Sequence, residues 1–131
     1  MKYTTTSHSK YSLKCHVVLV VKYRKKLLIN FGEVVKQIFH DVSINSDFKF
    51  DIMEVDKNHI HLLIDYKPTI TVKSIINRLK SVSTKKLWQQ HQEALKSHFW
   101  KEHTFWSSGY FVCSVGDASI ETIRKYIEEQ G

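Results

Sequence analysis

The feature that most constrains the fold is the alternation of polar and apolar side chains from His59 to Tyr66. Successive side chains of a β-strand point to opposite faces, so Ile60, Leu62 and Ile64 share one face of this predicted strand. The opposite face carries His59, His61, Leu63 and Asp65. The apolar triplet must be covered by other elements, so the pattern predicts a sheet with one packed face and one open face.

The rest of the chain supplies further strands and helices. In chain order we predict a strand over Leu13–Val21, a helix through Val34–Val42, a strand over Phe48–Met53, the strand His59–Tyr66, a helix after Pro68 capped by Thr69 or Thr71, a strand over Tyr110–Val115 and a helix over Ala118–Gln130 capped by Asp117. The stretch Gln90–Phe105 gives no clear assignment. This β-α-β-β-α-β order predicts an α+β, ferredoxin-like (RRM-like) fold, an antiparallel sheet with two helices on one face and a C-terminal helix.

The size and composition of the chain set further bounds. With 131 residues and no linker, residues 1–131 are predicted to form a single domain. The two cysteines stand in separate apolar runs, so we expect no disulfide scaffold and a cytoplasmic location. No apolar run is long enough to span a membrane. Twenty Lys and Arg against thirteen Asp and Glu give a net charge of +7, which favours a nucleic-acid partner but also fits a merely soluble basic protein.

The pair His59 and His61 is the first candidate for chemistry. Their imidazoles leave the same face about 7 Å apart along the strand. Two such rings can converge on one metal ion, each through a neutral nitrogen. The alternative is a pair of solvated histidines on the sheet surface.

Tyr126 and Gln130 are the second candidate. They stand four residues apart in the predicted last helix, on one face beside its isoleucine stripe, so the Tyr126 hydroxyl could reach a substrate next to the sheet. A tyrosine that only covers the core edge is the alternative. The Gln130 amide oxygen, if near the histidines, could complete a neutral ligand set that leaves positions for phosphate oxygens. Zinc also suits two histidines.

Basic side chains fall into two groups that could contact phosphates. One follows the first strand and the other lies on the second helix, although any single lysine can equally be a solvated surface residue. The candidates for DNA contact are Lys22, Tyr23, Arg24, Lys25, Arg78, Lys80 and Lys85.

Four blocks together resemble the single-tyrosine HUH transposases of small bacterial insertion sequences, the insertion-sequence 200/605 group. The blocks are Cys15–Val18 leading to Lys22–Lys25, then Asn58–Leu63 with the His-hydrophobic-His motif, then Leu79–Thr84, and finally Phe105–Phe111 with Val115–Gly116 and the ending Tyr126–Gln130. The resemblance runs from about Tyr11 to Gln130. The sequence departs from the family at Asn58, where relatives usually carry an acidic residue, and at Ser81 and Asp117, where glycine is common.

The resemblance implies a DNA transposase that cleaves and rejoins single-stranded DNA at the ends of insertion sequences. His59, His61 and Gln130 would then hold Mg²⁺ or Mn²⁺, and Tyr126 would form a 5′-phosphotyrosine intermediate. It also implies that DNA hairpins are recognised and that the protein is a homodimer in which the last helix can act in trans. Two other functions fit the residues: a non-catalytic module that binds single-stranded nucleic acid, and a metal-dependent phosphodiesterase without a covalent step.

Overall fold

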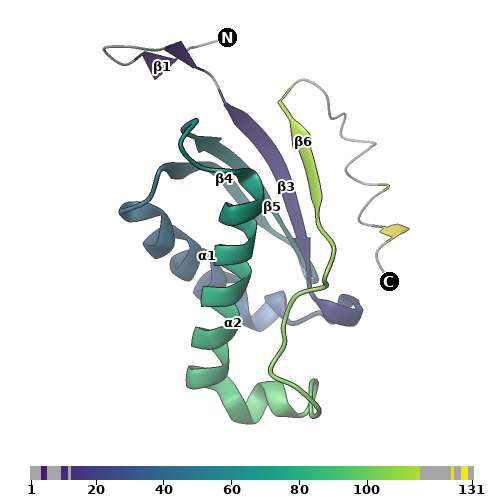
Figure 1. Cartoon of the computed structure of the whole chain (residues 1–131). Helices are drawn as coiled ribbons and strands as arrows, with labels where there is room; N and C mark the ends of the chain where they lie inside the picture. Colours follow the sequence, from purple (N-terminus) through teal and green to yellow (C-terminus); the bar gives the residue numbers. More distant parts are fainter. Residues whose placement is uncertain (1–3, 6–9, 12, 116–124, 126–127, 130–131) are drawn as a thin grey trace.

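A four-stranded antiparallel sheet with the strand order β4-β5-β3-β6 forms the centre of the fold (Figure 1). The computed structural model describes residues 4–5, 10–11, 13–115, 125 and 128–129. The elements are β1 (Thr4–Thr5), β2 (Lys10–Tyr11), β3 (Lys14–Val20), the 3₁₀ turn η1 (Lys22–Arg24), α1 (Leu28–Ile44), β4 (Phe48–Val55), β5 (His59–Tyr66), α2 (Val72–Lys96) and β6 (Phe111–Ser114). The predicted α+β, ferredoxin-like order is confirmed, and β1 pairs with β2 as a short addition that the sequence pattern did not predict.

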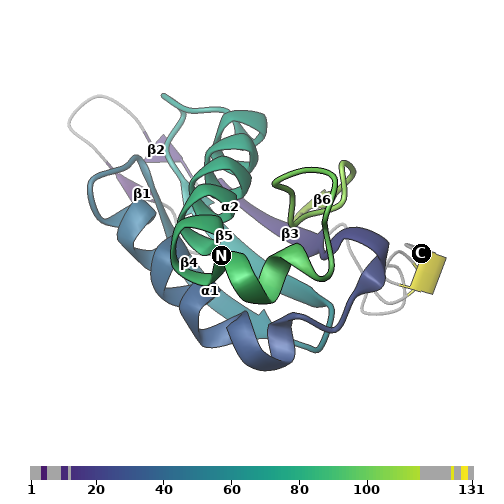
Figure 2. The same cartoon turned by 90° about the horizontal axis from the view of Figure 1, so that it is seen from below.

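Both helices lie on one face of the sheet, as Figures 1 and 2 show from two directions. Ile60, Leu62 and Ile64 of β5 are fully buried in the core beneath them. On the opposite face of β5, His59 and His61 are half-buried. The alternation in this strand therefore separates a packed face from an open face, as predicted.

The second helix resolves two points left open by the sequence. Thr71 is its N-cap, because the Thr71 hydroxyl accepts a hydrogen bond from the Ser74 amide at 3.1 Å. Thr69 instead donates its hydroxyl to Asp47 across the loop. The helix continues to Lys96, with non-helical backbone angles at His91, and so occupies the first part of the unassigned stretch.

Strand β4 departs from simple alternation. Strict alternation along the predicted strand Phe48–Met53 would put Phe48, Phe50 and Ile52 on one face, but the register with β5 shifts between Phe50 and Ile52. Such a β-bulge inserts one extra residue and reverses which side chains face inward beyond it. Met53 and Val55 accordingly pack against the core, whereas Ile52 is 37% exposed. Strict alternation therefore gives the wrong face for Ile52, because it cannot reveal a bulge.

Two predictions concern elements at the chain's C-terminal side. The strand predicted over Tyr110–Val115 is present as β6. The helix predicted over Ala118–Gln130, with its cap at Asp117, lies outside the described residues apart from Lys125, Glu128 and Glu129, which are helical and exposed.

Both cysteines are free thiols, as expected. Cys15 lies in the core, where burial raises its pKa to about 11. Within the described part of the chain, no helix combines the length and the apolar character that crossing a bilayer requires.

Candidate active site and nucleic-acid surface

His59 and His61 are held on the open face by the two neighbours of their strand. In the β3–β5 register, His59 lies opposite Val20 and His61 opposite Val18. On the other side His61 lies opposite Glu54 of β4. Burial lowers the pKa of His59, and the nearby charges of His61 and Arg24 lower it further against the opposing effect of Asp56. The lowered pKa favours the neutral form of His59, the form in which an imidazole can bind a metal.

A third histidine, His16 of β3, completes this part of the face. Its Nδ1 lies 2.8 Å from Nε2 of His61, and the two rings stack with centroids 5.1 Å apart. Burial, followed by the charge of His61, lowers the pKa of His16. The sequence offered one signal for this residue. His16 is the single polar side chain between Cys15 and Val21, and alternation places it on the open face.

The donor set suits a divalent metal but does not complete a site. His59 and His61 place two imidazoles on one face, a donor type that suits the metal pair predicted from the sequence. Among the described residues, no group of three or more His, Cys, Asp or Glu side chains is placed to hold a metal ion. The predicted third ligand, the amide of Gln130, is not among these residues.

Tyr126 and Gln130 both lie outside the described residues. One contact nevertheless links the C-terminal segment to the sheet. Arg24 Nη1 donates a hydrogen bond to the Glu128 backbone oxygen at 3.3 Å. The turn that holds Arg24 follows directly after β3, whose last residue, Val20, lies opposite His59.

The Lys22–Arg24 turn is strained. Tyr23 and Arg24 adopt φ values of 62° and 51°, the left-handed region that residues with a Cβ rarely occupy. Strain of this kind persists where the surroundings enforce it, and it concentrates at functional sites. Here it leaves the Tyr23 ring 66% exposed, with the Lys22 ammonium 5.6 Å from the ring centroid. An exposed ring beside a cation is suited to stacking on an unpaired base.

A groove of about 950 Å³, lined mostly by polar and charged residues, runs between α2 and the segment that leads into β6. Its lining includes Lys22, Lys80 and Lys85, three of the seven predicted DNA contacts. Lys22 forms an ion pair with Glu102 at 2.6 Å, and this hydrogen bond raises the pKa of Lys22. Trp88 and His103 stack in the same groove with ring centroids 4.1 Å apart. The groove thus combines cations with an aromatic pair, which are the groups that bind phosphates and bases.

Other predicted contacts have partners within the protein. The Lys80 ammonium is shared among the backbone oxygens of Ser107, Ser108 and Gly109, and burial lowers its pKa. Lys80 therefore fastens the turn before β6 to α2. Arg78 donates to the Ser46 hydroxyl at 3.0 Å, and the Lys25 ammonium lies 6.0 Å from the centre of the Phe99 ring.

The two sequence blocks around Leu79–Thr84 and Phe105–Phe111 pack against each other. Besides the contacts of Lys80, the buried Ser83 hydroxyl accepts a hydrogen bond from the Trp106 indole at 2.9 Å. The same hydroxyl donates to the Leu79 backbone oxygen at 2.6 Å. These residues hold the strand that borders β3 in place, so their first role is to build the sheet.

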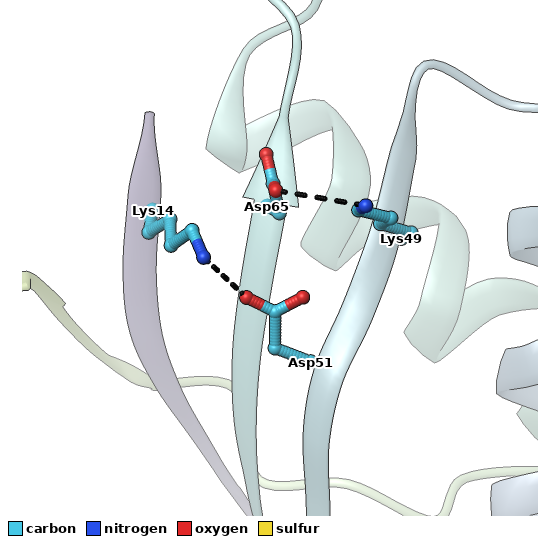
Figure 3. A network of polar contacts seen from close by, with 4 residues as sticks. All are labelled: Lys14, Lys49, Asp51 and Asp65. Atoms are coloured by element: carbon cyan, nitrogen blue, oxygen red, sulfur yellow. Dashed lines mark hydrogen bonds and ion pairs between the residues drawn. The ribbon is translucent and has the colours of Figure 1, made fainter. Parts of the chain in front are cut away.

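The far end of the open face, beyond the histidines, carries paired charges (Figure 3). Lys14 of β3 binds Asp51 of β4 at 2.7 Å, and this hydrogen bond raises the pKa of Lys14. Lys49 lies 4.0 Å from Asp65 of β5. Because each lysine faces a carboxylate, this end of the sheet offers little net positive charge to a phosphate.

Comparisons with known proteins agree with this architecture. The family described as "Transposase IS200 like" matches residues 9–130. The chain belongs to this family. It is 30% identical over 123 residues to the ISDra2 transposase TnpA of Deinococcus radiodurans, covering 92% of this chain and 85% of that protein. It is 29% identical over 127 residues to the transposase for insertion sequence element IS200 of Salmonella typhimurium, covering 95% and 80% of the two chains.

Two solved structures share the fold of this IS200-like chain. A crystal structure of a candidate transposase from Deinococcus radiodurans R1 superposes with a TM-score of 0.84 at 24% identity, covering 99% of this chain and 98% of the other. A REP-associated tyrosine transposase bound to a REP hairpin gives a TM-score of 0.57 at 11% identity, covering 96% and 70%. At these identities the two matches show the fold alone.

Proposed function

We propose that this IS200-like transposase cleaves and rejoins single-stranded DNA at the ends of an insertion sequence through a covalent bond to Tyr126. The observation that carries the proposal is the placement of His59 and His61, side by side and half-buried on the open face of a chain from this family. Two neutral imidazoles beside a basic surface are suited to holding a phosphate through a metal ion.

In the proposed reaction the phenolic oxygen of Tyr126 forms a bond to the phosphorus of the scissile phosphodiester. The bond from phosphorus to the 3′ oxygen breaks, and that oxygen takes up a proton to become a free 3′-OH. The product is a 5′-phosphotyrosine, which stores the ester bond so that a 3′-OH can later reverse the step. A free tyrosine has a pKa near 10, so a base must assist the loss of its proton.

His59, His61 and Gln130 are the proposed ligands for Mg²⁺ or Mn²⁺. When bound, the ion would polarise the phosphate and stabilise its charge during attack. The neutral ligand set leaves the positive charge of the ion to be balanced by DNA, so we expect DNA and metal to bind more tightly together than alone.

The proposed DNA partner is a single strand with hairpins. The lysine-lined groove beside α2 and the exposed Tyr23 ring support binding of phosphates and unpaired bases. The fold shared with a transposase that binds a REP hairpin supports hairpin recognition. We further propose a homodimer in which the helix of Tyr126 from one copy serves the histidines of either copy.

The substitution Tyr126→Phe tests the covalent step. An oligonucleotide labelled at its 3′ end should yield, with the unaltered protein, a slowly migrating adduct on a denaturing gel that protease removes. Tyr126→Phe should form no adduct while keeping its affinity for hairpin DNA. The control Tyr66→Phe alters a tyrosine at the opposite end of β5 from the histidines and should cleave normally.

The same gel separates the two other functions. A non-catalytic single-strand-binding module is favoured by the open sheet face and the net charge of +7, and it predicts no cleavage and no change in Tyr126→Phe. A metal-dependent phosphodiesterase predicts cleavage that leaves a free 5′-phosphate and no adduct. Either result would contradict the proposed covalent mechanism.

A further inference from the structure

In both histidines of the proposed metal pair, the Nδ1 atom lies near an oxygen acceptor. Nδ1 of His59 lies 3.0 Å from the side-chain oxygen of Asn58. Nδ1 of His61 lies 3.9 Å from a carboxylate oxygen of Glu54, within reach of its charge or of one bridging water. Both oxygens accept and neither can donate, so each favours the neutral form of its ring that carries the proton on Nδ1 and leaves the lone pair of Nε2 available.

The backbone brings these acceptors to the histidines in two different ways. Asn58 directly precedes His59 in the turn before β5. Glu54 reaches the open face through the bulge in β4. Without the shift between Phe50 and Ile52, Glu54 would share the inward face with Phe48 and Phe50. Because of the bulge, Glu54 lies directly opposite His61, and the Glu54 side chain is 72% exposed.

The third histidine of the open face, His16, contacts Nε2 of His61, the ring nitrogen that does not face Glu54. With the proton of His61 on Nδ1, beside Glu54, Nε2 of His61 would accept the 2.8 Å hydrogen bond and His16 Nδ1 would donate it. Nε2 is also the atom through which a histidine with a carboxylate on its other nitrogen binds a metal. His16 therefore stands where the metal would approach His61.

From these contacts we propose that Glu54 and Asn58 are positioning residues. Glu54 turns Nε2 of His61 toward the metal, and Asn58 does the same for Nε2 of His59. His16 holds Nε2 of His61 by a hydrogen bond until the metal replaces His16 there. This inference rests on the proposed function, because it uses the proposed ligands. Partners of this kind typically change metal affinity by about 10- to 100-fold.

Nitrogen-detected NMR of the metal-free protein tests the orientation directly. With ¹⁵N-labelled histidine, the rings of His59 and His61 should both carry their proton on Nδ1. Glu54→Ala should shift His61 toward a mixture of the two neutral forms and leave His59 unchanged. A wild-type His61 protonated on Nε2 would overturn the inference.

Calorimetric titration with Mn²⁺ tests the consequence for binding. Glu54→Ala and Asn58→Ala should each weaken Mn²⁺ binding by about 10-fold or more, whereas Asn58→Asp, which keeps an acceptor oxygen, should retain it. Glu93→Ala removes a similarly exposed carboxylate from α2 and is the matched control. Circular dichroism of each variant verifies that it is folded.

The substitution His16→Phe keeps a ring for stacking but removes the donated hydrogen bond. It should tighten Mn²⁺ binding several-fold, because the metal no longer has to displace that bond. Weaker binding would identify His16 as a ligand, and unchanged binding would show that it does not compete with the metal. Either result overturns the role proposed for His16.

The outcomes distinguish this inference from the proposed function. If the unaltered protein binds Mn²⁺ and Glu54→Ala and Asn58→Ala bind it equally well, the positioning roles fail while the covalent mechanism stands. If these variants lose affinity but Tyr126→Phe still forms the DNA adduct, the covalent role of Tyr126 fails while the positioning roles stand. A wild-type protein that binds no Mn²⁺ would overturn both the metal site and its positioning residues.

Discussion

The two faces of β5 have opposite tasks although they are built from alternating residues of one strand. The inward side chains Ile60, Leu62 and Ile64 are completely buried and fix the strand against the helices. The outward side chains His59 and His61 stay half-buried. His61 contacts His16 of β3 and Glu54 of β4, and His59 contacts the side chain of Asn58. The packed face thus supplies the rigidity, and the open face uses it to hold imidazoles in a defined orientation.

The largest effect expected on the open face follows from His61→Ala. Loss of a metal ligand should lower the cleavage rate by at least about 10³-fold, because a metal contributes several kcal/mol of charge stabilisation. The free energy of unfolding should change by less than about 1 kcal/mol, since the side chain lies outside the core. Single-turnover cleavage and urea unfolding measure the two quantities, and a large loss of stability would remove the contrast between the faces.

The substitution Leu62→Ala should have the opposite effect, a large loss of stability with the metal site retained. Truncating this fully buried side chain should cost about 2–5 kcal/mol of unfolding free energy through lost burial and the cavity that remains. Under conditions where the variant remains folded, Mn²⁺ should still bind to it. Urea unfolding with parallel titration checks this, and a variant as stable as the parent would show that the inward face contributes little to the fold.

A smaller effect is expected from Tyr23→Ala in the strained turn beside the open face. Removing one stacking ring should weaken binding of a single-stranded oligonucleotide by about 1–3 kcal/mol, or roughly 5- to 150-fold. Ile44→Ala, which trims an exposed apolar side chain at the end of α1, is the control. Fluorescence anisotropy measures both affinities. An equal loss in the two variants would argue against a specific role for the Tyr23 ring.

The smallest effect concerns pH. Burial holds the pKa of His16 and of His59 below the ordinary value near 6.5, so the folded protein binds these protons less readily than the unfolded chain. Their contribution to stability is therefore complete above about pH 6.5 and is lost as the pH falls toward the folded pKa values. Urea unfolding at pH 7.5 and 5.5 should show lower stability at pH 5.5, and His16→Phe should reduce the difference. Greater stability at pH 5.5 would contradict this sign.

The sequence predicted features that arise from periodicity. The alternation in β5, the helical spacing of α1 and the cap at the start of α2 each depend on neighbouring residues, and all are present. The open-face position of His59 and His61 followed from the same alternation. The prediction that Tyr126 and Gln130 join them concerns residues outside the described ranges.

The parts that sequence reasoning missed depend on contacts between distant segments. His16 meets His61 only because β3 and β5 pair antiparallel, and the register of that pairing is not encoded locally. Glu54 required knowledge of the bulge in β4. Lys80 looked like a free surface cation, but the turn before β6 returns to it and supplies three backbone oxygens.

The bulge in β4 makes the length of that strand as important as its composition. Deleting Asp51 would remove the extra residue, so regular pairing would return with Met53 and Val55 still facing the core. A strand that kept Asp51 but lost the bulge would instead turn Met53 and Val55 toward water and bring the Glu54 carboxylate into the core where they now pack. Relatives that differ here by a one-residue gap should therefore be aligned by the pairing of this strand with its neighbour rather than by residue similarity.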